Sequence, residues 1–263
     1  MVSLLPAGAA AQTHRMKNVA LCNGADRTSS EPQIRGCTAL IGSKGETPRV
    51  LAIAYNNRGN AYVAQGDYDR AIEDFDKALT IDPTYAKALN NRAVAFGKKG
   101  QHEQAVRDLD AAIAHHPGYA LAFANRGDIH LRSGHFQRAA GDYSEAIRLQ
   151  PTSAALSGRC RARAGLDDVH GALADCNEAV KAGPDAAALE SRGLAYLKLG
   201  QWDLAVADYD AALTMDPQRA AARYGRSLAY SRMAAPDRAA ADVAGALSAA
   251  PDIADEFARF GLK

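Results

Sequence analysis

The stretch "NNRGNAYVAQGDYDRAIEDFDKALTIDP", residues 56–83, decides the fold. It holds two helix-forming segments separated by a Gly-Asp turn, and it ends at Pro83, which cannot continue a helix. Prolines return after it at intervals of 33 or 34 residues, at Pro117, Pro151, Pro184, Pro217 and Pro251. A fixed interval of this length indicates an internal repeat, in which each unit is one small supersecondary structure.

The repeat divides the chain into six units, at 52–85, 86–119, 120–152, 153–185, 186–219 and 220–253. When positions are counted from the first residue of each unit, positions 20 and 27 are alanine in all six units. Position 8 is always small: Gly59, Ala93, Gly127, Cys160, Gly193 and Ser227. Each unit therefore predicts a helix A, a short turn and a helix B whose backbones approach closely across small side chains.

Charge and hydropathy exclude several classes of partner. The 31 basic and 30 acidic residues nearly cancel, so the chain has no overall field that would attract nucleic acid or an anionic membrane. The sequence has no apolar run long enough for a transmembrane helix, which takes about 18 or more residues. We expect neither nucleic-acid binding nor membrane insertion.

The spacing of Gly, Tyr, Gly, Ala, Phe, Ala and Pro within residues 56–83 resembles that of the tetratricopeptide repeat (TPR) family. The resemblance extends over all six units, residues 52–253. It implies an all-α fold, a right-handed superhelical solenoid of antiparallel helix hairpins. It also implies that the concave face, lined mainly by the A helices, binds peptides or proteins.

The two ends of the chain require separate interpretations. Residues 1–12 predict either the remnant of a secretory signal or a disordered tail, because Val2–Gln12 is a short apolar stretch ending in small residues. Residues 13–51 are expected to form a degenerate hairpin that covers the first unit. Residues 254–263 are expected to end a capping helix, since Ile253, Phe257 and Phe260 fall on one side of it.

Arginine at position 7 is unusual, and each of these arginines is followed sixteen residues later by an aspartate. The pairs are Arg58 and Asp74, Arg92 and Asp108, Arg126 and Asp142, Arg159 and Asp175, Arg192 and Asp208, and Arg226 and Asp242. A guanidinium suits a two-bond contact with a carboxylate, so the spacing predicts a ladder of ion pairs between helices A and B. The alternative is an arginine stripe for phosphate or an acidic peptide.

The four cysteines fall in two pairs with similar spacing. Cys22 and Cys37 are fifteen residues apart, and Cys160 and Cys176 are sixteen apart. Cys160 and Cys176 occupy positions 8 and 24, where other units place a small residue opposite a large one, so we expect a disulfide across that hairpin. Cys22 and Cys37 are candidates for a second disulfide. Two buried thiols are the alternative for a cytosolic protein. No CxxC or paired-histidine spacing indicates a metal site.

Candidate ligand-binding residues come from positions 2, 6, 9 and 13 of helix A, which share one face. They include a series of asparagines at position 6, and asparagine can both donate to and accept from the main chain of an extended peptide. We predict a peptide-binding groove formed by Asn57, Asn60, Lys87, Asn91, Lys98, Asn125, Asp128, Arg132 and Arg161.

The predicted groove can be compared with the carboxylate clamp that some TPR proteins use. Some TPR proteins hold a terminal carboxylate with two lysines, two asparagines and one arginine, and here only Lys87, Asn91 and Asn125 match. Ala154 and Gly158 stand in place of the second lysine and the arginine, with Arg132 or Arg161 as substitutes. The sequence thus departs from the standard carboxylate clamp.

No nucleophile elbow, phosphate-binding glycine loop or metal motif stands outside the repeat pattern. We therefore predict a non-catalytic interaction scaffold that uses no cofactor or metal, takes no small-molecule substrate, and binds another protein or peptide. Alternatives are a structural assembly subunit or a regulatory domain of a larger system. The N-terminus and the cysteines favour a periplasmic or secreted protein, with a cytoplasmic one as the alternative.

Overall fold

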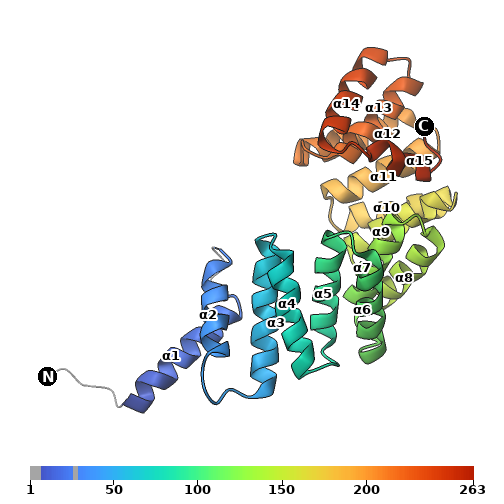
Figure 1. Cartoon of the computed structure of the whole chain (residues 1–263). Coiled ribbons are helices and arrows are strands. Elements are labelled where there is room, and N and C mark those ends of the chain that lie inside the picture. The colour runs from blue at the N-terminus through green and yellow to red at the C-terminus, as the bar shows by residue number, and fades with distance from the viewer. Residues whose placement is uncertain (1–6, 26–28) are drawn as a thin grey trace. The chain divides into compact units, whose positions relative to one another are not determined.

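The computed structural model describes residues 7–25 and 29–263, and in this part of the chain it contains fifteen helices and no strand. The helices pack as sequential antiparallel hairpins (Figure 1), which confirms the predicted all-α hairpin fold. Of the predicted signal-like or disordered segment 1–12, residues 1–6 lie outside the described residues and residues 7–12 belong to the first helix. None of the described helices combines the length and apolar character needed to cross a bilayer.

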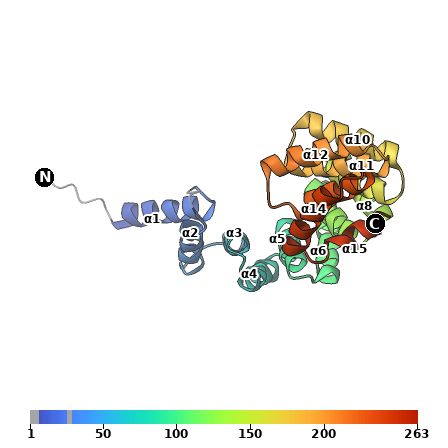
Figure 2. The same cartoon turned by 90° about the horizontal axis from the view of Figure 1, so that it is seen from above.

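The chain divides into two compact units, residues 1–118 and 119–263, and each is described by itself. The first unit contains α1 (Ala7–Cys22), α2 (Glu31–Ile41), α3 (Pro48–Ala64), α4 (Tyr68–Ile81), α5 (Ala86–Lys98) and α6 (His102–His115). Helices α1 and α2 form a hairpin that packs against α3. In Figure 2, α3 and α4 are seen nearly end-on and side by side.

The second unit contains four repeat hairpins and one further helix. Its helices are α7 (Ala120–Arg132), α8 (Phe136–Leu149), α9 (Ser153–Gly165), α10 (Val169–Ala182), α11 (Ala186–Lys198), α12 (Trp202–Met215), α13 (Ala220–Arg232), α14 (Pro236–Ala249) and α15 (Ile253–Arg259). In each hairpin, helix A and helix B are separated by a turn of three residues, so they pack antiparallel along their whole length.

The same turn position has a left-handed backbone in all six repeats. Four repeats place glycine there, for example Gly66 with φ of 77° and Gly200 with φ of 70°. The other two place Asp167 (φ 60°) and Ala234 (φ 56°), residues that carry a steric cost in this region. The turn geometry is therefore kept even where the sequence lacks glycine.

Small residues on one helix of each hairpin pack against large residues on the other, as the sequence predicts. The repeated alanines at positions 20 and 27 are at most 6% exposed. A side chain added at Gly59 would lie 2.6 Å from the Phe75 ring, and one at Gly193 would lie 2.9 Å from the Tyr209 ring. Because the rings rest directly on these glycines, helices A and B reach the close packing of a protein interior.

The structure brings together all six predicted Arg-Asp pairs. In each pair Nε donates to one carboxylate oxygen and Nη2 to the other, over 2.6–3.0 Å. The six aspartates are only 2–8% exposed. A carboxylate this deeply buried requires a charged, hydrogen-bonded partner, and the arginine supplies one.

A second contact of the same arginines joins successive repeats. The remaining Nη1 of Arg92 donates to Asp76 on the preceding helix B over 2.6 Å, and that of Arg226 donates to Asp210 over 2.6 Å. Ser144 and Asn177 accept the corresponding bonds from Arg159 and Arg192, both over 3.4 Å. This contact was not predicted, although the sequence carries its signal: a polar residue stands two positions after the ladder aspartate in repeats one to five.

The ladder predicts unequal costs for two aspartates that contact arginines. Asp208→Asn should lower the free energy of unfolding by roughly 2–4 kcal/mol, because it breaks a buried charge-assisted contact and leaves the Arg192 guanidinium partly unpaired. Asp210→Asn, which removes the charge from the exposed contact with Arg226, should cost only about 0–1 kcal/mol. Urea denaturation of both variants measures the difference, and equal costs would contradict this division of roles.

Both predicted cysteine pairs are disulfides in the structure. Cys22 and Cys37 join α1 to α2, with Cα atoms 4.5 Å apart, and Cys160 and Cys176 join α9 to α10, with Cα atoms 5.5 Å apart. All four cysteines are at most 1% exposed. Each bond crosses one hairpin, so each fixes a local helix pair.

Removing either disulfide should destabilise the chain by about 3 kcal/mol, the amount expected for closing a loop of this length. The test compares thermal unfolding of Cys160→Ala with Cys176→Ala against the unmodified chain, each with and without a reductant. The reductant should lower the midpoint of the unmodified chain more than that of the double variant. An unmodified chain that does not respond to complete reduction would rule out this stabilising role.

Candidate functional site

Within each of the two compact units, the A helices of successive repeats contact one another and form a continuous surface. Helix α3 contacts α5 in the first unit, and α7, α9, α11 and α13 contact one another in succession in the second. We call the A-helix surface of α3 and α5 the first face; it carries Asn57, Asn60, Lys87, Asn91 and Lys98. We call the A-helix surface of α7, α9, α11 and α13 the second face; it carries Asn125, Asp128, Arg132, Arg161, Lys198 and Leu228.

A chain of asparagine amides runs across the first face. Asn90 donates to Asn91 (3.2 Å), Asn91 donates to Asn56 (2.9 Å), Asn56 donates to Asn57 (3.2 Å), and Asn57 donates to Asn23 (3.1 Å). Asn56 and Asn90 are only 3% and 1% exposed. The amides thus link α3 to α5 and to the residue that follows α1.

Two of the predicted groove asparagines, Asn57 and Asn91, therefore already contact neighbouring amides. Each amide has two N–H donors and two acceptor sites on its oxygen, so these bonds use only part of its capacity. Asn56 and Asn90 were not predicted as part of this surface, although an Asn-Asn doublet precedes the arginine in both the first and the second repeat. Asn60, Lys87 and Lys98 are exposed on the same face.

A hollow of about 700 Å³ opens at the start of α3 and α5. Its lining combines apolar and charged side chains: Pro48, Arg49, Ala52, Ile53, Ile81, Asp82, Tyr85, Ala86, Lys87 and His116. Both helix N-termini carry partial positive charge, Arg49 and Lys87 add two full positive charges, and the carboxylate of Asp82 opposes them. Burial and the neighbouring Asp82 raise the pKa of Tyr85, so its phenol stays neutral at physiological pH. The hollow suits an apolar group that carries a negative charge.

On the second face, the C-terminal segment contacts two of the residues that the sequence predicts for a groove, Arg132 and Arg161. Arg161 donates to Glu256, and Lys198 Nζ donates to the Phe260 carbonyl oxygen over 2.6 Å. Arg259 donates to the carbonyl oxygen of Arg132 at the end of α7. Helix α15 packs against α13 and α14 of the last hairpin, and Figure 1 shows it beside the C-terminus.

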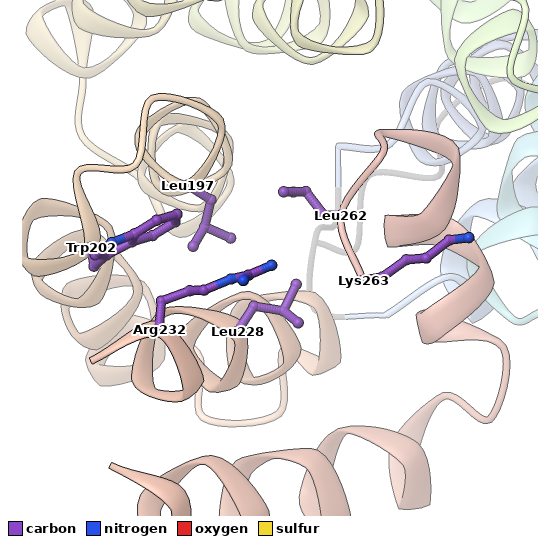
Figure 3. Close-up of a pocket in the computed structure, with 6 residues that line it drawn as sticks. All are labelled: Leu197, Trp202, Leu228, Arg232, Leu262 and Lys263. Carbon is purple, nitrogen blue, oxygen red and sulfur yellow. The ribbon is translucent and has the colours of Figure 1, made fainter. Parts of the chain in front are cut away.

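The apolar side of α15 is buried by this arrangement. The Phe260 ring lies 5.2 Å from the Phe136 ring, and the Phe257 ring lies 5.0 Å from the Tyr224 ring, measured between centroids. Ile253, Phe257 and Phe260 are each 4% exposed. Beyond α15, Leu262 points toward Leu197 at a small hollow of about 130 Å³ (Figure 3).

Arg161 belongs to a line of alternating charges. One of its Nη atoms lies 3.9 Å from the buried carboxylate of Glu190, whose other oxygen accepts a bond of 2.8 Å from Arg219. With Glu256 on its outer side, Arg161 contacts two carboxylates at once. The sequence predicts Arg161 as a groove residue, and in the structure this side chain contacts Glu256 of the C-terminal segment.

Two tyrosines shape the second face from below. Tyr143 reaches past Gly158 and donates to Asp128 over 2.6 Å, and Tyr209 lies directly against Gly225. Burial raises the pKa of the Tyr143 phenol, and the surrounding side chains raise that of Asp128 by excluding water. Among the described residues, the Tyr209 hydroxyl has no hydrogen-bond partner. Glycine stands at position 6 in the two repeats where a tyrosine of the preceding helix B needs the space: Gly158 beside Tyr143, and Gly225 beside Tyr209.

Two glycine-to-alanine changes should have opposite effects. Gly225→Ala should lower the free energy of unfolding by roughly 1–3 kcal/mol, because its methyl group would overlap the Tyr209 ring. Gly97→Ala, also within an A helix but with open space around it, should raise that free energy by about 0.5–1 kcal/mol. Urea denaturation tests both, and a Gly225→Ala chain as stable as the unmodified one would refute the steric explanation.

Family models agree with the repeat positions. A tetratricopeptide repeat model matches residues 52–85, a second matches residues 90–154 and 125–187, and a TPR repeat model matches residues 193–233. The chain belongs to the tetratricopeptide repeat family. No curated protein matches this TPR chain in sequence.

Solved structures share its fold at low sequence identity. A tetratricopeptide repeat protein from Parabacteroides merdae is 18% identical with a TM-score of 0.72, over 95% of this chain and 99% of that one. The APC/C hetero-tetramer Cut9-Hcn1 contains a chain that is 19% identical with a TM-score of 0.73, over 94% of this chain and 52% of that one. This chain therefore spans about half the length of that relative.

A third similar structure is YrrB, described as a TPR protein with an unusual peptide-binding site. It is 21% identical with a TM-score of 0.50, over 73% of this chain and 100% of that one. At these identities the three structures support the TPR fold alone.

Among the described residues of this chain, no cluster of His, Cys, Asp and Glu could hold a metal ion.

Proposed function

We propose that this TPR protein is a non-catalytic interaction scaffold that binds an extended peptide segment of another protein on the first face. TPR domains generally mediate protein–protein interactions, and the observation that carries the proposal here is the hollow at the start of α3 and α5. A hollow of about 700 Å³ is the size of a ligand site and lies directly beside the chain of asparagine amides.

The charges of the hollow select the chemistry of the segment. Arg49 and Lys87 lie at two helix N-termini, so an acidic side chain or a terminal carboxylate is favoured there. Ile53 and Tyr85 offer apolar contact to the adjacent side chain of the segment. The unused donors and acceptors of Asn57, Asn60 and Asn91 would then meet the main chain of the peptide.

The disulfides support a place for this scaffold in an oxidising compartment, the periplasm or the exterior of the cell. Disulfides persist there and are rare in the cytosol of most organisms. Each disulfide lies within one hairpin, next to one of the two A-helix faces. Cys22 precedes Asn23 of the amide chain, and Cys160 precedes Arg161 of the second face. Oxidation would thus hold both A-helix faces in shape.

A peptide display library panned against the full chain tests the proposal. Selected peptides should share an acidic residue or a terminal carboxylate next to an apolar residue. Arg49→Ala with Lys87→Ala should weaken their binding at least about 10-fold, because each lost charge-assisted contact is worth about 1.5–3 kcal/mol. The affinity is measured by fluorescence anisotropy with synthetic versions of the selected peptides.

Arg107→Ala is the matched control, because Arg107 is an exposed basic residue on helix B of the same unit. It should leave peptide binding unchanged. If Arg107→Ala weakens binding as much as the double variant does, binding follows general charge and the proposal fails. Binding that withstands both Arg49→Ala with Lys87→Ala and Asn57→Ala with Asn91→Ala would point to another surface and favour an assembly subunit.

A further inference from the structure

We propose that the second face is a separate docking site for an amphipathic helix with the pattern Ile-x-x-Glu-Phe-x-x-Phe, and that residues 253–260 occupy it as an internal ligand. The partner is a helical segment of another protein that presents a glutamate beside two aromatic residues and replaces the tail. This inference rests on the proposed interaction function, but it concerns a different surface and a different ligand shape.

Helix α15 depends on the face for its structure. It has seven residues, and an isolated helix of that length does not form in water. Its apolar residues contact side chains from several repeats, among them Phe136 on α8 and Tyr224 on α13. The segment is therefore ordered by the surface on which it lies, as a bound peptide would be.

The face, in contrast, is assembled by the repeats. Arg219 on the loop before α13 fixes the carboxylate of Glu190, and Glu190 in turn lies beside Arg161 on α9. Lys198, at the end of α11, also contacts the turn residue Asp167 over 2.5 Å. These cations are held in place by residues outside the tail, so the face keeps its positive charge when the tail leaves.

The chemistry of the contact defines the partner. Two cations, Arg161 and Lys198, meet a glutamate and a helix C-terminal carbonyl, respectively. A helix that ends at this point places the negative end of its dipole beside Lys198. Aromatic residues four and seven positions after the isoleucine fill the apolar part of the face, as Phe257 and Phe260 do. An acidic-aromatic helix fits this surface better than a basic one.

The test uses the full chain with Phe257→Asp and Phe260→Asp, which should release the tail. A fluorescent peptide with the sequence of residues 251–263 should bind this variant, and should bind the unmodified chain at least about 100-fold more weakly, because the attached tail competes at millimolar effective concentration. The peptide carrying the same two aspartates is the matched control and should not bind.

A charge reversal tests the orientation of the ligand. Arg161→Glu, added to the released variant, should weaken binding of the peptide at least about 10-fold, as expected for a lost charge-assisted contact. The peptide with Glu256→Arg should then regain affinity for the Arg161→Glu chain. A folded, released variant that fails to bind the unmodified peptide overturns the proposal, and so does a reversal that neither weakens nor restores binding.

Hydrogen exchange on the unmodified chain decides the matter if the released variant unfolds. Adding the peptide at millimolar concentration should speed exchange of the amides of residues 256–262 and leave those of α11 unchanged. Unchanged exchange of the tail would overturn the proposal. Dimers of the unmodified chain that disappear in the tail variant would identify a second copy as the occupant and would also overturn it.

Failure here is distinguishable from failure of the first-face proposal. Peptides selected for Arg49 and Lys87 should bind the released variant and the unmodified chain equally, since both residues belong to the first compact unit and the tail belongs to the second. Loss of only one of the two binding activities therefore identifies which face is wrong.

Discussion

In every repeat a guanidinium on helix A makes two hydrogen bonds to a buried carboxylate on helix B, and this contact fixes how the two helices pack. The pair would be costly if either partner were missing, because a buried charge without a partner is strongly destabilising. The third guanidinium nitrogen of the arginine donates to the preceding helix B, as Arg92 does to Asp76. The same side chain therefore fixes the angle within one hairpin and the step to its neighbour. This leaves the opposite side of helix A, with its asparagines, lysines and arginines, available for other contacts.

Contacts that recur with the repeat could be predicted from the sequence, and contacts that occur once could not. The Arg-Asp pairs and the hairpin disulfides lie fifteen or sixteen residues apart, so a constant interval places them across one hairpin. Only part of the amide chain could be predicted, because helical periodicity identified Asn57 and Asn91 but not their buried neighbours, Asn56 and Asn90. The amphipathic pattern of the tail was evident, but its contacts could not be predicted from a repeat interval, because Arg259 contacts Arg132 across 127 residues and this contact occurs once.

The difference between the two faces arises beneath them. Where helix B carries Phe75, the next A helix can keep Asn91 at position 6. Where helix B carries Tyr143 or Tyr209, the longer side chain needs the space, and the next A helix has Gly158 or Gly225. At these two positions the tyrosine ring occupies the space that a side chain on the next A helix would need. The first face remains a row of amides suited to an extended main chain, and the second becomes a smoother surface suited to a helix.

A tail that occupies a binding face changes what the face can select. A partner must compete with a ligand that is attached by a linker of only three residues, 250–252, so its observed affinity is its intrinsic affinity reduced by the small fraction of time the face is open. Weak, partial matches, such as helices with the aromatic residues but without the glutamate beside Arg161, then fall below useful affinity. Only a segment that reproduces both the charge and the aromatic spacing compensates for displacing the tail. Specificity in this protein would therefore come from what the tail excludes as much as from what the repeats attract.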